Sequence, residues 1–182
     1  MKILFCRHGE TIWNQQGRLQ GHLDSDLSSL GESQARQLGL ALAKFNPAHI
    51  LTSDLGRAKC TALLANEHLK ISIETSSLLR ERGFGALEGV YRDQSAEMWQ
   101  AYEQRFERNF IGIESAESAS EVLNRVELFF DYLKSFTFET LIVICHGEWL
   151  RIFQNTIQGL QPWSNKLSLP KNCQVIEYDF KL

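Results

Sequence analysis

The chain has 182 residues, 43% of them hydrophobic, and a formal net charge of −3 at pH 7. This length suits one ordinary domain with a single well-packed core. The slightly negative charge excludes a bulk attraction to nucleic acid or to an acidic membrane surface, so locally placed cations must bind any anionic ligand. No stretch approaches the roughly 18 to 20 apolar residues of a membrane span.

The predicted elements alternate between strand and helix. After a strand at 2–6, apolar spacing predicts a helix over 31–45, with Ser29 and Glu32 as its capping box. The later elements are strands at 49–51, 71–75, 141–145 and 174–180, and helices at 55–68, at about 122–133 behind a second capping box (Ser118 and Glu121), and from about 148. This alternation predicts an α/β fold, a three-layer α/β/α sandwich with a mostly parallel central sheet.

The domain organisation is expected to be simple. With three prolines and no repeat or low-complexity run, the chain is predicted to form a single domain over 1–182. Residues 92–117 depart from the alternation, and we interpret them as a helical lid or cap-like insert. Its aromatic residues either pack the segment onto the body or wall a substrate pocket: Trp99, Tyr102, Phe106 and Phe110.

The cellular location is predicted from the first residues and the cysteines. Arg7 interrupts the opening apolar run before the core of a signal peptide could form. The four cysteines form no CxxC pair, which is typical of reduced thiols: Cys6, Cys60, Cys145 and Cys173. We therefore expect a cytoplasmic protein.

Two predicted strands end in a histidine. Arg7 and His8 follow the first strand, and His146 follows the strand at 141–145. A histidine beside an arginine is commonly a structural residue. However, ligands of open parallel sheets lie beyond the carboxyl ends of the strands, so two such histidines are predicted to converge on one crevice.

Two more charged residues are candidates for this crevice. Ser53 is a good N-cap for the helix that starts near residue 55, which places Arg57 in its first turn, where free N–H groups favour an anion. By spacing alone, Arg57 could equally be a solvated surface residue. Glu81 lies in a glycine-rich run at 79–89, where a carboxylate is either a general acid or the partner of a neighbouring arginine.

Together these segments resemble the histidine phosphatase superfamily, which includes cofactor-dependent phosphoglycerate mutases and many small phosphatases. The resemblance rests on five blocks in the family's order: RHGETIWN at 7–14, GRLQG at 17–21, SDLGRAKCTA at 53–62, LRERGFGALEG at 79–89 and CHGEWLR at 145–151. Each block is weak alone, and together they are highly specific. They are most similar to the small phosphatase branch.

The resemblance implies a role for each residue. His8 would be the nucleophile that becomes phosphohistidine, and Glu81 would donate a proton to the leaving oxygen. Arg7, Arg57 and His146 would bind the phosphoryl oxygens. The remaining substrate-binding positions would be Asn14, Gln20, Gly21, Arg82 and Gly147. The resemblance implies no metal ion and no cofactor.

These roles make physical sense. Phosphoryl transfer spreads negative charge over three phosphoryl oxygens. A planar guanidinium group can donate paired hydrogen bonds to such oxygens. The attacking imidazole nitrogen must be unprotonated, so the other ring nitrogen of His8 should donate to a backbone carbonyl.

The main departure from the family pattern is Glu148, where a glycine or small residue is common. A carboxylate there would repel substrate unless it points away, caps the helix or pairs with Arg151.

Several functions stay open. The segment between Glu81 and His146 and the segment after His146 are shorter than in the classical phosphoglycerate mutases that the chain resembles. This favours a phosphomonoester hydrolase of a small phosphorylated metabolite, such as alpha-ribazole phosphate or a sugar phosphate. The alternatives are phosphoglycerate mutase-type transfer and a non-catalytic binder of phosphorylated ligands. A zinc site is a further alternative, although cysteine and histidine are close in sequence in each strand: Cys6, His8, Cys145 and His146. The oligomeric state is not predicted.

Overall fold

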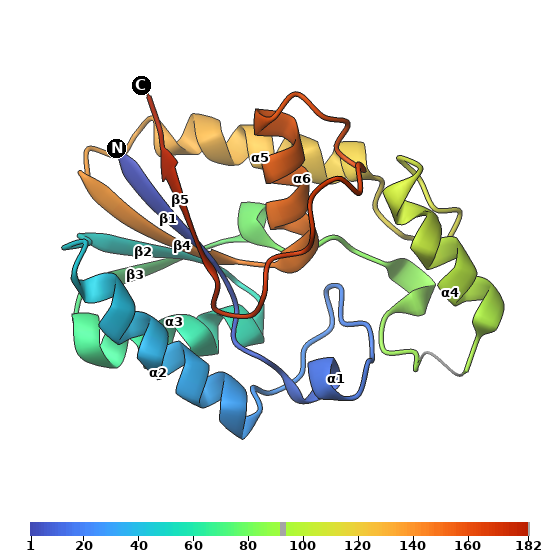
Figure 1. Cartoon of the computed structure of the whole chain (residues 1–182), viewed down its shortest axis with the longest axis horizontal. Helices are drawn as coiled ribbons and strands as arrows, with labels where there is room; N and C mark the ends of the chain where they lie inside the picture. Colours follow the sequence, from blue (N-terminus) through green and yellow to red (C-terminus); the bar gives the residue numbers. More distant parts are fainter. Residues whose placement is uncertain (92–93, 182) are drawn as a thin grey trace.

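The computed structural model describes residues 1–91 and 94–181. At its centre is a five-stranded sheet in the order β3-β2-β4-β1-β5. Four strands are parallel and the last one along the chain is antiparallel to β1: β1 (Lys2–Arg7), β2 (His49–Ser53), β3 (Ser72–Ser76), β4 (Thr140–Cys145) and β5 (Val175–Asp179). The predicted α/β fold with a mostly parallel sheet is confirmed (Figure 1).

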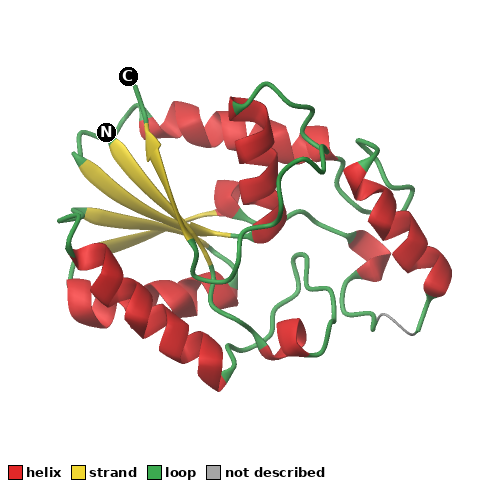
Figure 2. Ribbon diagram, in the orientation of Figure 1, coloured by secondary structure: helices red, strands yellow, loops and turns green. Residues whose placement is uncertain are grey.

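Helices cover both faces of the sheet, as predicted for a three-layer sandwich. In Figures 1 and 2, α2 (Ser29–Ala43) and α3 (Gly56–Leu69) lie on one face, and α5 (Ala119–Leu133) and α6 (Gly147–Ile157) lie on the other. Successive side chains of a strand point to opposite faces. Leu4 therefore belongs to the core under α2 and α3, and its neighbour Phe5 belongs to the core under α5 and α6. Burial on both faces explains why the residues at 3–6 of β1 and 141–145 of β4 are apolar without alternation.

The shorter elements gather beyond the carboxyl end of the sheet. They are α1 (Ile12–Gln15), η1 (Ser77–Leu79), η2 (Gly85–Leu87), α4 (Ala96–Glu103) and η3 (Gln104–Phe106). Figure 1 shows α4 beside the sheet rather than over it. The predicted insert at 92–117 begins with two residues outside the described ones, and the rest of it carries α4 and η3.

The aromatic side chains of this segment divide between two environments. Trp99 and Tyr102 pack edge-on at 5.1 Å, and Tyr102 meets Phe84 at the same distance in a third apolar cluster. Phe110 is 52% exposed. These aromatic side chains therefore hold the segment to the loop that carries Phe84, and only some of them are buried in the core.

The predicted caps were right for α5 and wrong for two other helices. The Ser118 and Glu121 box at α5 is confirmed. The N-cap of α2 is Ser28, which accepts from the Gly31 amide, so the box predicted on Ser29 is wrong by one residue. At α3 the N-cap is Leu55 rather than Ser53, and the free amides of the first turn donate instead to Asp24, in a distant loop. Among the helices of the described residues, none has the length and apolar character needed to cross a membrane.

Candidate active site

The two histidines lie side by side at the carboxyl edge of the sheet. Because β1 and β4 are parallel neighbours with Arg7 opposite Cys145, the residue after each strand emerges at the same edge. The His8 amide donates to the Cys145 carbonyl at 3.0 Å, which continues the ladder by one bond. The ring centroids of His8 and His146 are 5.2 Å apart. The predicted convergence is confirmed.

A backbone contact fixes the tautomer of His8. Its Nδ1 lies 2.7 Å from the Gly9 carbonyl oxygen, which can only accept, so Nδ1 carries the proton and Nε2 keeps its lone pair. Burial, reinforced by Arg57 and Arg7, lowers the pKa of His8 well below its ordinary value. The ring is therefore neutral near pH 7, as expected for a nucleophile.

His146 has the same charge state and fewer partners. Burial lowers its pKa well below the ordinary value, and Arg57, His8 and Arg7 act in the same direction. Both ring nitrogens are buried, and neither has a hydrogen-bond partner among the described residues. A buried imidazole without partners is costly, so this ring is suited to a polar ligand.

These shifts predict how stability depends on pH. Below about pH 6.5 the unfolded chain binds protons on these histidines while the folded protein does not, so the free energy of unfolding should fall as the pH falls. Each such histidine contributes a slope of up to about 1.4 kcal/mol per pH unit. Urea unfolding at pH 7.0, 6.0 and 5.5 measures the slope. His8→Asn, in which the new side chain does not titrate, should show a shallower slope. Equal slopes in the two proteins would contradict a neutral buried His8.

Two guanidinium groups flank the histidines: Arg57 is buried and Arg7 is partly exposed. Arg57 is 2% exposed, which excludes the solvated alternative. Its terminal nitrogens donate to the carbonyls of Gly21 and Leu23, each at 2.8 Å, and to Asp24 at 2.9 Å. Arg7 donates to the Pro170 carbonyl at 2.8 Å. Because the protein itself holds both groups, their orientation does not depend on a ligand.

Glu81 lies against the amino end of α6. Its Oε1 accepts from the backbone amides of Arg82 at 2.9 Å, Glu148 at 3.1 Å and Trp149 at 3.2 Å. Among the described residues, its Oε2 accepts one hydrogen bond, from the Glu148 amide at 3.3 Å. The free amides at the start of a helix are natural partners of a carboxylate, so Glu81 is held by one oxygen while the other stays more available.

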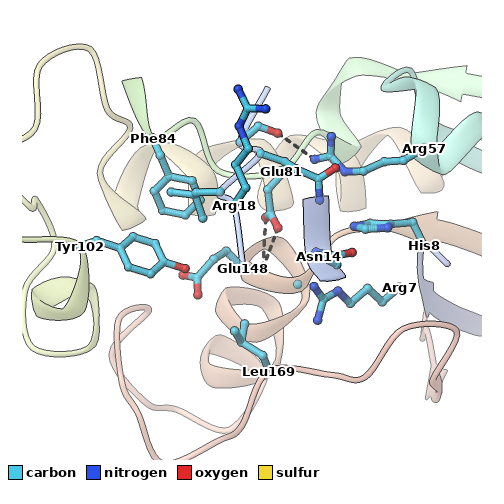
Figure 3. Close-up of a pocket in the computed structure, with 14 residues that line it drawn as sticks. Arg7, His8, Asn14, Arg18, Arg57, Glu81, Phe84, Tyr102, Glu148 and Leu169 are labelled. Carbon is cyan, nitrogen blue, oxygen red and sulfur yellow. Dashed lines mark hydrogen bonds between the residues drawn. The ribbon is translucent and has the colours of Figure 1, made fainter. Parts of the chain in front are cut away.

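One pocket joins these groups, with about 440 Å³ of space that is partly open to solvent. Figure 3 shows Arg7, His8 and Arg57 on one side of it, and Phe84 and Tyr102 on the other. Eight of the site residues predicted from the sequence line this pocket: Arg7, His8, Asn14, Gln20, Gly21, Arg57, Glu81 and Gly147. His146 is not among the lining residues, although its ring centroid lies 5.2 Å from that of His8.

Arg82 is the predicted site residue that the structure places elsewhere. It is fully buried, and it donates to the carbonyls of Glu117 at 2.8 Å and Asn109 at 3.1 Å. It does not line the pocket, so the prediction that it binds substrate is not supported by its position. Its contacts instead tie the end of the 94–117 segment to the glycine-rich loop.

Other lining residues were not predicted as site residues. Arg18 and Leu19 belong to the GRLQG block, and membership of that block was the sequence feature that could have identified them as site residues. Tyr102 was identified only as part of the aromatic stripe, and Glu148 only as a departure from the family pattern. Leu169 lies between α6 and β5 in a loop without any pattern that indicates a pocket.

The zinc alternative conflicts with the packing of the cysteines. Cys6 lies in the apolar cluster under α2 and α3, whereas Cys145 lies in the cluster under α5 and α6. Their sulfurs therefore belong to opposite faces of the sheet and cannot join two histidines around one tetrahedral ion.

The fold and the site together define an α/β protein with a pocket at the carboxyl edge of its sheet, in which a neutral histidine lies beside two arginines that the protein itself holds in place. The sequence matches the family described as the histidine phosphatase superfamily (branch 1) over residues 3–181, so the chain belongs to this superfamily.

Known relatives fall on both sides of the phosphatase and mutase division. The chain is 29% identical over 184 residues to the probable phosphoglycerate mutase GpmB of Escherichia coli O139:H28 (strain E24377A / ETEC), covering 100% of this chain and 86% of that protein. It is similar to the solved mycobacterial glucosyl-3-phosphoglycerate phosphatase in complex with VO3, with 26% identity, a TM-score of 0.87 and coverage of 97% and 91%. The alpha-ribazole phosphatase from Shigella flexneri shares the fold, with 23% identity, a TM-score of 0.86 and coverage of 100% and 91%.

Proposed function

We propose that the protein is a phosphomonoester hydrolase that works through a covalent phosphohistidine on His8. The observation that carries this proposal is the Nδ1 contact of His8 with the Gly9 carbonyl, which leaves Nε2 unprotonated in a pocket with Arg7 and Arg57. A neutral nucleophile beside fixed positive charge is what attack on a phosphoryl group requires.

The reaction has two steps. In the first, Nε2 of His8 forms a bond to phosphorus while the ester oxygen leaves and takes a proton from Glu81. In the second, a water molecule gives a proton to Glu81 and attacks phosphorus, the N–P bond breaks, and inorganic phosphate is released. Oε2 of Glu81 is suited to the proton transfers because Oε1 already accepts three amide hydrogen bonds.

The phosphoryl group would also satisfy polar atoms that the described protein leaves without partners. These are the buried Nε of Arg7, the buried Nε of Arg57, and one ring nitrogen of His146, because a neutral imidazole donates from only one nitrogen and phosphoryl oxygens only accept. Charge spread over three equatorial oxygens would be stabilised by groups that are already in place. We therefore assign phosphoryl binding to Arg7, Arg57 and His146.

The rest of the pocket belongs to the leaving group, for which we propose a small phosphorylated metabolite. Asn14, Gln20, Gly21 and Gly147 line the pocket. Figure 3 shows Asn14 beside Arg7 and His8, whereas Phe84 and Tyr102 contribute rings at the far end. The described part of the 92–117 insert would act as a wall of the pocket through Tyr102. A sugar phosphate or an alpha-ribazole phosphate would fill such a pocket.

Phosphoglycerate mutase-type transfer is the second candidate, because the likeness to a probable phosphoglycerate mutase covers the whole chain. A mutase must return the phosphoryl group to a reoriented substrate rather than to water. The pocket is partly open to solvent, which favours the hydrolase.

The proposal predicts that the purified protein hydrolyses p-nitrophenyl phosphate with undiminished rate in the presence of a chelator, since every group in the two steps belongs to the chain. Release of nitrophenolate and phosphate measures the reaction. Loss of activity with chelator and recovery with zinc would contradict it. Isomerisation of 3-phosphoglycerate that depends on 2,3-bisphosphoglycerate would favour the mutase. Phosphate binding without turnover would indicate a non-catalytic binder.

A further inference from the structure

The wall of the pocket away from His8 contains a buried carboxylate that the proposed reaction does not use. Glu148 is 3% exposed and lines the pocket (Figure 3). It pairs with Arg105 at 3.3 Å and with Arg151 at 2.6 Å, and neither arginine lines the pocket. Pairing with Arg151 was one of the arrangements expected from the sequence. A bound leaving group therefore meets the carboxylate, with its two cations behind it.

The hydrogen bonds of Glu148 leave room for one more donor. Oε1 accepts from Nε of Arg105 and Nε of Arg151, both at 3.3 Å, and Oε2 accepts one bond from Arg151 at 2.6 Å. A carboxylate has about four acceptor positions, so one remains on Oε2. Burial alone would raise the pKa of this carboxyl, but Arg151, Arg105 and Arg82 outweigh burial and hold the pKa below its ordinary value. The Glu148 carboxylate is thus a charged hydrogen-bond acceptor in the wall of the pocket.

The other groups around the leaving group are mostly apolar. Leu19, Phe84, Tyr102 and Leu169 line the pocket together with Glu148. The cation on this side is Arg18, whose guanidinium lies 3.8 Å from the ring centroid of Trp13 and donates to the Gly89 carbonyl. These contacts hold Arg18 against its own neighbours, so Glu148 is a charged acceptor set among the apolar side chains of this wall.

We propose that Glu148 is a specificity-determining residue, which selects neutral leaving groups that carry hydroxyls and rejects leaving groups that carry a carboxylate. This inference rests on the phosphatase function proposed above. A hydroxyl can donate to the remaining position on Oε2. A second carboxylate has no proton to donate and would face the like charge of Glu148, which is itself only 3% exposed. The substrate class is therefore that of polyol and sugar phosphates rather than phosphorylated acids.

A matched pair of substrates tests the inference. Glycerol 3-phosphate and 3-phosphoglycerate differ only in a hydroxymethyl group against a carboxylate. We expect kcat/KM to be about tenfold or more higher for glycerol 3-phosphate, as like-charge repulsion requires. Glu148→Gln, which keeps the shape and removes the charge, should reduce this ratio about tenfold. A purely structural role would lower both values equally and leave the ratio unchanged.

Glu103→Gln is the matched control. Glu103 pairs with the same Arg105 at 3.3 Å, but it is half exposed and does not line the pocket, so its variant should keep the wild-type ratio. A ratio that shifts equally in both variants would overturn the proposal. A wild-type preference for 3-phosphoglycerate would also overturn it and would assign recognition of the acid to Arg18.

Two further measurements separate the sources of failure. Hydrolysis of p-nitrophenyl phosphate by the wild type tests the phosphatase function alone, so a failure there is distinct from an unmoved substrate ratio. Should Glu148→Gln not fold, inhibition of wild-type p-nitrophenyl phosphate hydrolysis serves instead. Glycerol 3-phosphate should then inhibit at about tenfold lower concentration than 3-phosphoglycerate, and equal inhibition would overturn the proposal.

Discussion

His8→Ala is expected to lower the hydrolysis of p-nitrophenyl phosphate by about 10⁴-fold or more, because it removes the atom that would bond to phosphorus. The loss should be in kcat, since the proposed phosphate-binding groups Arg7, Arg57 and His146 remain. Steady-state kinetics measures kcat, and competitive inhibition by product phosphate measures phosphate binding. The inhibition constant should change far less than kcat.

The control for this variant is His68→Ala, a histidine on α3 that does not line the pocket. It should keep wild-type activity. The intermediate itself can be sought by quenching the reaction in denaturant and locating the covalent phosphate by mass spectrometry. We expect it on the peptide that contains His8. Intact activity in His8→Ala, or phosphate on a different peptide, would remove the nucleophile from the proposal.

Glu81→Gln is expected to separate substrates by their leaving groups. An alkyl phosphate needs a proton on its departing oxygen, so its kcat should fall by about 10²- to 10⁴-fold when the acid is lost. Nitrophenolate leaves without that help, so p-nitrophenyl phosphate should lose much less. The comparison of glycerol 3-phosphate with p-nitrophenyl phosphate in the same preparation measures the difference directly.

The variant also tests whether Glu81 is only structural. A glutamine oxygen can still accept from the amides of Glu148 and Trp149, so the start of α6 should stay in place. Glu177→Gln, an exposed residue that pairs with Lys2, provides a charge-matched control with wild-type behaviour. An equal loss on both substrates in Glu81→Gln would argue against proton donation.

Residues at the ends of predicted strands were predicted well. The apolar runs at 2–6 and 141–145 placed His8 and His146 at strand ends, and parallel pairing of β1 with β4 then brings such ends together. The need for a carbonyl partner at Nδ1 of His8 was likewise anticipated, and Gly9 meets it within one residue. Such contacts are determined by backbone geometry next to the motif.

Contacts between distant segments were the ones missed. Asp24, rather than Ser53, accepts from the first turn of α3, and it also pairs with Arg57. The resemblance implied that Arg82 binds substrate, yet its guanidinium donates to carbonyls of the 109–117 stretch. Both outcomes depend on how loops pack in three dimensions, for which spacing along the chain carries no signal.

The sequence by itself determined the alternation of strands and helices, the parallel sheet and the identity of the groups at its carboxyl edge. Periodic burial and strand-end placement are local or repetitive properties, so the order of residues is enough to predict them. Only the tertiary structure decided which charges face the pocket. Glu148 is the clearest case, because Arg105 reaches it from η3, 43 residues earlier in the chain, and Arg151 lies one helical turn away. Whether a buried carboxylate is neutralised, exposed to a ligand or both depends on partners that pack against it, and these partners come together only when the chain has folded.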